Sequence, residues 1–131
     1  MSDNIRVVAI AFFRHTDQKY LICRRGPAES GAGAWEFPGG KIDVGETETQ
    51  ALVREIQEEL SVQIQAEKLI YISAHDHQYE TKKIHITLYK YDVQNLNYIL
   101  IDHDQAEWVL LSEIKKYNLA QADILFIDKL R

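Results

Sequence analysis

The segment Arg54–Leu60, "REIQEEL", holds the residues best suited to chemistry. Glu55, Glu58 and Glu59 are spaced i, i+3 and i+4, which places their carboxylates on one face of a helix. Such like charges repel each other, at a cost of about 0.2–0.5 kcal/mol per pair. Because Mg²⁺ prefers oxygen ligands, a bound cation would offset this repulsion. The pattern therefore predicts either a divalent-metal site or a solvated acidic face of a helix.

The segment 38–46, "PGGKIDVGE", precedes this helix and is rich in glycine. Glycine lacks a Cβ atom and lets the backbone come close to a ligand. Lys41 follows the glycine pair, where it could contact a phosphate or brace the loop. We interpret this segment as a loop that leads into the acidic helix.

Residues 40–62 form a longer pattern, "GKIDVGETETQALVREIQEELSV". Five residues separate Gly40 from Glu46, and seven separate Glu46 from Arg54. The pattern resembles the Nudix box, Gx5Ex7REUxEExGU, in which U is an aliphatic residue. Ser61 is the one departure, because the family has a glycine there, at the end of the helix. A left-handed residue other than glycine costs about 1 kcal/mol, so we expect a small loss of stability rather than of activity.

This resemblance implies a set of metal ligands. The carboxylates of Glu55, Glu58 and Glu59 would bind Mg²⁺, or Mn²⁺ in its place, together with the carbonyl oxygen of Gly39. Glu107 matches a glutamate outside the box that reaches the metal in MutT-like members of the family. Either Glu55 or Glu107 would orient or deprotonate the attacking water. The alternative for Glu107 is a surface residue beside a core tryptophan.

The resemblance also implies roles in catalysis and substrate binding. Arg54 would pair with Glu46 and hold the loop to the helix. Arg25 matches a position that touches the substrate phosphate, although it could also be a solvated strand end. Asp123 matches the position that reads the edge of the base, with an exposed or helix-capping aspartate as the alternative. Phe37 would lie near the base, or else in the core.

The chemistry of Asp123 bears on the substrate. An ionised carboxylate only accepts hydrogen bonds, which suits a base edge rich in donors, such as the amino group of cytosine. Only a protonated, buried Asp123 could match the altered edge of 8-oxoguanine. The stretches "WEFPGGKID" and "HITL" resemble the MutT branch, whereas "LAQADI" is similar to relatives that prefer cytidine triphosphates.

The activity implied is Mg²⁺-dependent hydrolysis of a nucleoside triphosphate to the monophosphate and pyrophosphate. The first expectation is a MutT-like enzyme that removes 8-oxo-dGTP or related nucleotides from the precursor pool. The alternative is a pyrophosphohydrolase of CTP or modified dCTP. Another nucleoside diphosphate derivative as substrate, or a binding module without catalytic activity, would be further alternatives.

The elements that must position these residues follow from periodicity. β-Branched and aromatic residues predict strands over residues 5–13, 20–25, 35–37, 68–79, 82–93 and 105–111. A capping box of Thr47 and Gln50 begins the acidic helix, which buries a stripe of Leu52, Ile56 and Leu60. We expect two more helices, over residues 112–117 with Ser112 as N-cap and over residues 121–131.

This order of elements is an α+β pattern. The resemblance implies an α/β/α sandwich with a mixed β-sheet, in which the box forms a loop–helix–loop. The 131 residues predict a single domain, 1–131. Because the net charge is −5, a nucleic-acid polymer is not expected as a partner. The expected partner is a small nucleotide.

The remaining features bear on compartment and assembly. Cys23 is the single cysteine, so no internal disulfide is predicted. The N-terminal apolar run lacks the pattern of a signal peptide, and no run approaches the roughly 20 residues of a membrane span. We expect a cytoplasmic protein without membrane contact, present as a monomer or homodimer.

Overall fold

The computed structural model describes residues 3–79 and 81–130. Glu80, between the predicted strands 68–79 and 82–93, and Arg131 of the predicted last helix lie outside the described residues. The centre of the fold is a mixed sheet in the order β3-β2-β1-β6-β5, with β4 paired to β1 and β7 paired to β2. The strands are β1 Asp3–Arg14, β2 Lys19–Arg25, β3 Trp35–Glu36, β4 Gly39–Lys41, β5 Ile70–Tyr79, β6 Lys82–Val93 and β7 His103–Leu110.

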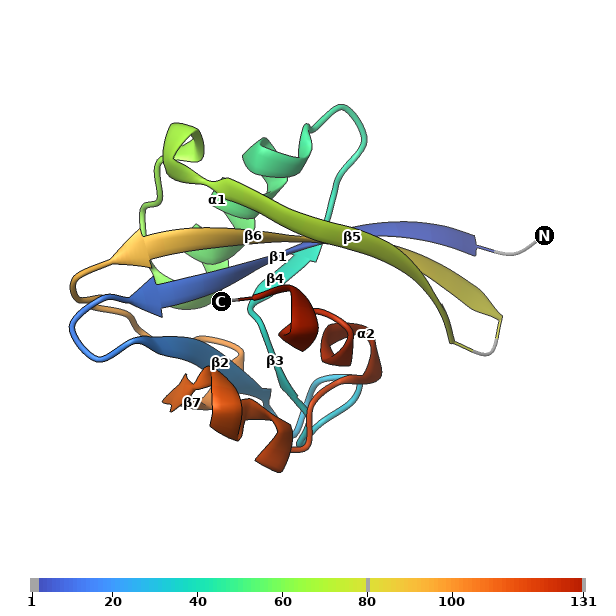
Figure 1. Cartoon of the computed structure of the whole chain (residues 1–131). Coiled ribbons are helices and arrows are strands. Elements are labelled where there is room, and N and C mark those ends of the chain that lie inside the picture. Colours follow the sequence, from blue (N-terminus) through green and yellow to red (C-terminus); the bar gives the residue numbers. More distant parts are fainter. Residues whose placement is uncertain (1–2, 80, 131) are drawn as a thin grey trace.

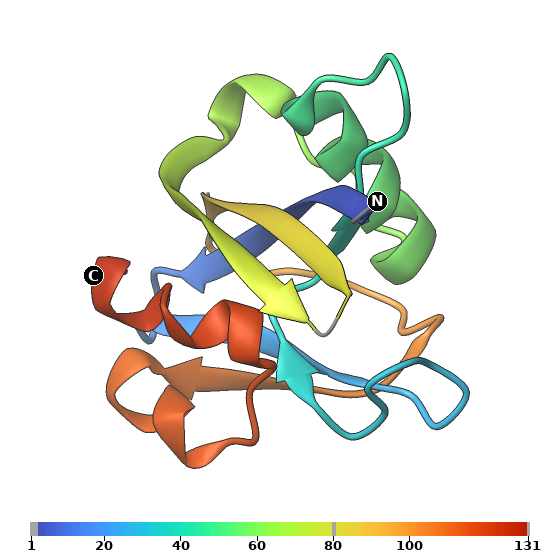
Figure 2. The same cartoon turned by 90° about the vertical axis from the view of Figure 1, so that its right-hand side faces the viewer.

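Two apolar clusters cover the two faces of this sheet, as alternation along the strands requires. The first, the α1-side cluster, joins the sheet to helix α1 (Glu48–Leu60) and contains Val8, Ile10, Phe12, Leu21, Cys23, Leu52, Ile56 and Leu60. The second, the α2-side cluster, joins it to the C-terminal segments and contains Ala9, Ile22, Phe37, Ile86, Leu88, Ala122, Phe126 and Ile127. Figures 1 and 2 show α1 and the C-terminal segments on opposite sides of the strands. The predicted sandwich around a mixed sheet is confirmed.

Helix α1 begins as its sequence predicts. The Thr47 side chain accepts a hydrogen bond from the Gln50 backbone N–H, and the Gln50 side chain accepts one from the Thr47 backbone N–H. The stripe of Leu52, Ile56 and Leu60 is fully buried. In the first turn, Glu48 accepts hydrogen bonds from side chains of β6, so the start of α1 is tied to the middle of the sheet.

Strand β4 is a correction to the predicted loop over residues 38–46. Gly39 pairs with Ala9 and Gly40 pairs with Val8, in an antiparallel ladder at the edge of β1. A Cβ atom at Gly39 would clash with the backbone of Val8 and Ala9. Glycine has low strand propensity, which hides this strand in the sequence, but only glycine permits so close an approach.

The structure also corrects the helix predicted over residues 112–117. The segment Leu111–Lys116 is a 3₁₀ helix, η2, preceded by Leu110, and no side chain caps its start. Ser112 therefore lies inside the element and is not its N-cap. Another 3₁₀ turn, η1 (Ala66–Lys68), connects α1 to β5.

The predicted helix over residues 121–131 is broken in two, α2 (Gln121–Ile124) and the 3₁₀ helix η3 (Ile127–Lys129). The cause lies at Ala122, whose carbonyl oxygen accepts a hydrogen bond from Nε2 of His75 at 2.8 Å. The Phe126 N–H, which would bond that oxygen in an α-helix, donates to the carbonyl of Asp123 instead. Phe126 and Ile127 are buried, whereas Ile124 and Leu125 are exposed.

Helix α1 ends in the left-handed conformation, and its last turn holds a distant loop. Ser61 has φ 55° and ψ 39°. The carbonyl oxygens of Leu60 and Glu59 accept hydrogen bonds from the backbone N–H groups of Ile99 and Ile101. The loop that precedes β7 is thereby fixed to the end of the helix. In the described part of the chain, no helix is long and apolar enough to span a membrane.

The conformation of Ser61 yields a stability prediction. We expect Ser61→Gly to raise the free energy of unfolding by about 0.5–1 kcal/mol, because glycine adopts positive φ without a Cβ penalty. Chemical denaturation measures the change. Ser61→Ala is the control, since it removes the hydroxyl group but keeps Cβ and should bring no gain. Equal stability of the glycine and alanine variants would contradict the prediction.

Candidate active site

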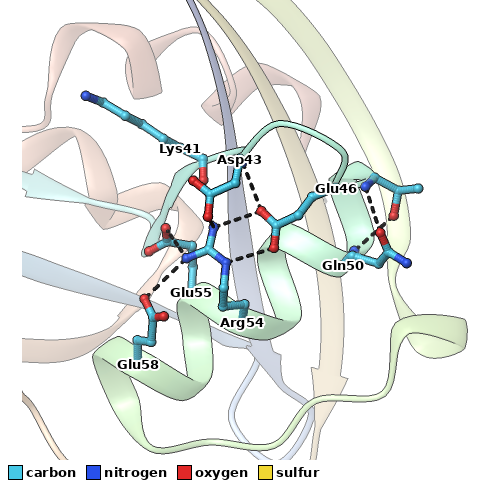
Figure 3. A network of polar contacts seen from close by, with 8 residues as sticks. Lys41, Asp43, Glu46, Gln50, Arg54, Glu55 and Glu58 are labelled. Carbon is cyan, nitrogen blue, oxygen red and sulfur yellow. Dashed lines mark hydrogen bonds and ion pairs between the residues drawn. The ribbon is translucent and has the colours of Figure 1, made fainter.

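The side chain of Arg54 joins the loop before α1 to the acidic face of the helix. Its Nε and Nη2 atoms donate to both carboxylate oxygens of Glu46, at 2.8 and 2.9 Å, as the resemblance implied. Nη2 also donates to the carbonyl oxygen of Lys41 at 3.0 Å. Nη1 donates to one oxygen of Glu55 at 3.0 Å and to one oxygen of Glu58 at 3.3 Å, as Figure 3 shows.

This network stabilises the charged forms of both Arg54 and Glu46. Hydrogen bonding to Glu46 raises the pKa of Arg54, and the same bond lowers the pKa of Glu46. Asp43 adds a further ion pair with Arg54 at 3.4 Å. Arg54 therefore neutralises part of the repulsion between the helix carboxylates, and it does so without a metal ion.

Glu59 is the most buried of the three helix glutamates. Its side chain is 12% exposed, against 15% for Glu55 and 59% for Glu58. Burial raises the pKa of Glu59 to about 9, with further contributions from a hydrogen bond to Glu55 and from the charges of Glu55, Glu36 and Asp102. Its Oε1 atom is buried and has no hydrogen-bond partner. Glu59 is thus a carboxyl group held in a site where a positive charge would be favourable.

Asp102, at the end of the loop that precedes β7, was missed by the sequence reasoning. The backbone N–H of the preceding residue, Ile101, donates to the carbonyl oxygen of Glu59, which brings Asp102 to the end of α1. The charge of Asp102 also contributes to the raised pKa of Glu59. The predicted ligand Glu107 lies on β7 opposite Ile22, a residue of the α2-side cluster. Its neighbours in sequence pack against the α1-side cluster, so alternation points Glu107 to the other face. The structure does not bring Glu107 to the acidic helix, and the acidic run "DHD" was the available signal for Asp102.

The glycine pair brings the backbone against the acidic helix. A Cβ atom at Gly40 would clash with the carboxyl group of Glu55, so a larger residue there would displace this carboxyl group from the loop. Gly39 lies next to it on β4, where its carbonyl was predicted to bind the metal. Lys41 contributes its backbone carbonyl to Arg54, while its exposed side chain extends away from the network.

Arg25 is occupied by partners within the protein. Its Nη1 atom donates to Oε1 of Glu36 at 2.9 Å, and its Nε atom donates to the carbonyl oxygen of Ser30. Its side chain is 32% exposed. Arg25 is therefore a half-buried ion-pair partner at the end of β2.

Asp123 is buried, which contradicts the alternative of an exposed aspartate. It is 3% exposed, and its Oδ2 atom accepts a hydrogen bond from the backbone N–H of Phe37 at 2.9 Å. Burial raises the pKa of Asp123 to about 8, and the charge of Glu36 adds to the shift. The side chain of Phe37 is buried in the α2-side cluster. Asp123 thus ties α2 to the end of β3 as a carboxyl group that is mostly protonated at neutral pH.

The donor chemistry fits a divalent cation. In residues 3–79 and 81–130, no three His, Cys, Asp or Glu side chains already stand in the geometry of a metal site. Arg54 contacts one oxygen of Glu55 and one of Glu58, while Glu59 offers a buried oxygen without a partner. Carboxylate oxygens are the ligands that Mg²⁺ prefers. The residues that the sequence singled out therefore supply a suitable set of donors.

The family follows from a comparison with known proteins. A family model described as the NUDIX domain matches residues 4–130. The chain belongs to the Nudix family. It is 34% identical to the CTP pyrophosphohydrolase of Escherichia coli strain K12, over 95% of this chain and 89% of that protein. It is also 40% identical to the 8-oxo-dGTP diphosphatase of the same strain, over 63% of this chain and 60% of that protein.

A solved structure agrees with this assignment. The solution structure of the E. coli ORF135 protein superimposes with a TM-score of 0.82, at 31% identity, over 98% of this chain and 89% of that one. The predicted family, its fold and its class of enzyme, a MutT-like Nudix hydrolase, are confirmed.

The buried carboxyl group of Asp123 makes the stability of this Nudix hydrolase depend on pH. Its pKa in the folded state, about 8, is above the ordinary value of 3.8. Between these values Asp123 binds a proton in the folded chain but not in the unfolded chain, so its contribution to the free energy of unfolding falls as pH rises. We expect this fall between pH 5 and pH 8 to be smaller in Asp123→Asn, because the amide does not titrate.

Urea denaturation at both pH values, in the presence of a chelator, measures this difference. The exposed Asp128 provides the matched control, since Asp128→Asn should keep the pH dependence of the wild type. An Asp123→Asn variant with the same pH dependence as the wild type would show that this carboxyl group is not protonated in the folded protein.

Proposed function

We propose that this chain is a Mg²⁺-dependent nucleoside triphosphate pyrophosphohydrolase that releases the nucleoside monophosphate and pyrophosphate. Mn²⁺ would serve in place of Mg²⁺. The observation that carries the proposal is the buried, unpartnered oxygen of Glu59 beside Glu55 on the acidic face of α1. A carboxyl group in this position is stabilised most by a cation shared with its neighbours.

The proposed ligands are Glu55, Glu58 and Glu59, with the carbonyl oxygen of Gly39 as a further donor. We propose Asp102, in place of Glu107, as the acidic residue from outside the box. A bound divalent ion would lower the pKa of a coordinated water and screen charge on the phosphoryl oxygens.

The residues of the chain have separate tasks in this reaction. Arg54 holds Glu55 and Glu58 in place, and its bond to Glu46 keeps the loop against the helix. Glu55 is our candidate for orienting the attacking water, because Gly40 leaves room for its carboxyl group at the loop. Arg25 is proposed to contact a substrate phosphate through the exposed part of its side chain, while Glu36 holds its Nη1 atom.

Two base classes are supported, each by one observation. Cytidine is favoured by the relative that matches nearly the whole length of this chain, the CTP pyrophosphohydrolase. An oxidised guanine is favoured by the 8-oxo-dGTP diphosphatase, which matches a shorter part of this chain. The raised pKa of Asp123 does not distinguish the two bases. A protonated carboxyl group both donates and accepts, so it complements the paired donor and acceptor that either base presents.

Pyrophosphate release across a panel of nucleotides tests the activity. The panel contains the natural nucleoside triphosphates, 8-oxo-dGTP and 5-methyl-dCTP, each with Mg²⁺ and with a chelator. We expect metal-dependent release of pyrophosphate and the monophosphate, with CTP or 8-oxo-dGTP turned over fastest. Release of inorganic phosphate, or no turnover of any nucleotide, would contradict the proposal and favour a binding module.

Glu58→Gln tests the ligand set. Glu58 is exposed on α1, so the variant should fold with an unchanged melting temperature. Mutation of a residue that hydrogen-bonds a metal ligand typically lowers metal affinity or activity by about 10–100-fold. We therefore expect loss of a ligand itself to lower turnover about 100-fold or more. Glu67→Gln, an exposed glutamate on η1, is the matched control and should keep full turnover. Turnover of Glu58→Gln close to the wild type would remove this residue from the site.

A further inference from the structure

A β-bulge at the start of β7 turns His103 toward the acidic helix. Gln105 pairs with Arg24, but His103 pairs with Arg25, so the register shifts by one residue between them. Cys23 and Arg25 are two positions apart on β2, and Cys23 belongs to the α1-side cluster. His103 therefore faces α1, which regular alternation from β7 would not allow, and bulges often re-aim a side chain next to an active site.

One ring nitrogen of His103 is anchored. Its Nε2 atom lies 2.9 Å from Oε2 of Glu36, and the other oxygen of Glu36 is held by Arg25 at 2.9 Å. A carboxylate only accepts hydrogen bonds, so Nε2 is the donor. His103 is 7% exposed, and this contact fixes the plane of its ring inside the protein.

The other ring nitrogen faces Glu59. Nδ1 of His103 lies 3.9 Å from Oε1 of Glu59. Both atoms are buried, and neither has a hydrogen-bond partner. A buried polar atom without a partner is costly, and this site holds two such atoms facing each other. Such a cost is expected where a side chain serves function rather than stability.

We propose that His103 is a positioning residue, which is anchored on Glu36 and sets the orientation of the Glu59 carboxyl group for metal binding. The inference rests on the proposed function, because it concerns the same cation. Groups behind the ligands orient them, and their loss typically lowers metal affinity or activity by 10–100-fold. Glu36 is the second member of this positioning pair.

Mn²⁺ binding to the full chain tests this role without relying on turnover. Electron paramagnetic resonance reports free Mn²⁺ and gives its Kd. We expect His103→Leu to raise this Kd by about 10-fold or more. The metal concentration for half-maximal activity should rise in parallel, while KM for the nucleotide at saturating metal stays unchanged. His103→Asn, whose amide can take the place of Nδ1, should recover part of the lost affinity.

Two further variants separate positioning from general structure. His15→Leu replaces an exposed histidine in the β1–β2 turn and should leave the Kd unchanged. Glu36→Gln should raise the Kd less than His103→Leu, because the amide oxygen can still accept from one donor. Each variant must keep a melting temperature within a few degrees of the wild type. If His103→Leu melts lower than this, His103→Asn is used as the test variant in its place.

Two results would overturn the inference in distinguishable ways. Wild-type Mn²⁺ affinity in folded His103→Leu or His103→Asn, with normal metal dependence, would show that His103 only fills space. A wild-type chain that neither binds Mn²⁺ nor releases pyrophosphate would overturn the proposed function itself, and this inference with it.

Discussion

The site depends on how one short helix holds several carboxylates close together. Arg54 provides the positive charge that offsets much of their repulsion. It contacts both oxygens of Glu46 and one oxygen each of Glu55 and Glu58. Its planar guanidinium group can satisfy several acceptors at once, which a lysine could not. Without this cation the loop and the first turns of α1 would repel each other, and the backbone of β4 would lose its support through Lys41.

Glu59, which Arg54 does not reach, lies in different surroundings from Glu55 and Glu58. Glu59 lies near Glu36. Burial raises the pKa of the Cys23 thiol, and the charges of Glu36 and Glu59 add to this shift. The protein thus combines one half of the site, where Arg54 pairs the carboxylates, with a buried half, where a proton takes the place of a counter-ion. A cation bound between the two halves would contact both the carboxylates paired with Arg54 and the buried Glu59. This division arises because one face of α1 packs against the sheet.

Much of this arrangement is visible in the sequence, because it is local. The spacing of Glu55, Glu58 and Glu59, the capping box and the pairing of Arg54 with Glu46 all lie within one stretch of chain. What the sequence does not reveal depends on distant contacts. Strand β4 forms because its glycines can pair closely with the backbone of β1. The last helix breaks because His75 of β5 hydrogen-bonds a carbonyl oxygen that an α-helix would use. Asp102 and Glu107 could be told apart only by the bulge and the faces of β7.

The last turn of α1 fixes the loop before β7. Backbone hydrogen bonds from Ile99 and Ile101 fasten this loop to Leu60 and Glu59, just ahead of Asp102. The exposed residues Gln94 and Asn95 lie before these fastenings, whereas Leu96 and Tyr98 pack against the α1-side cluster. Loop closure costs little more for each added residue. Evolution could therefore insert residues at 94–95 while the position of Asp102 relative to the helix carboxylates stays the same.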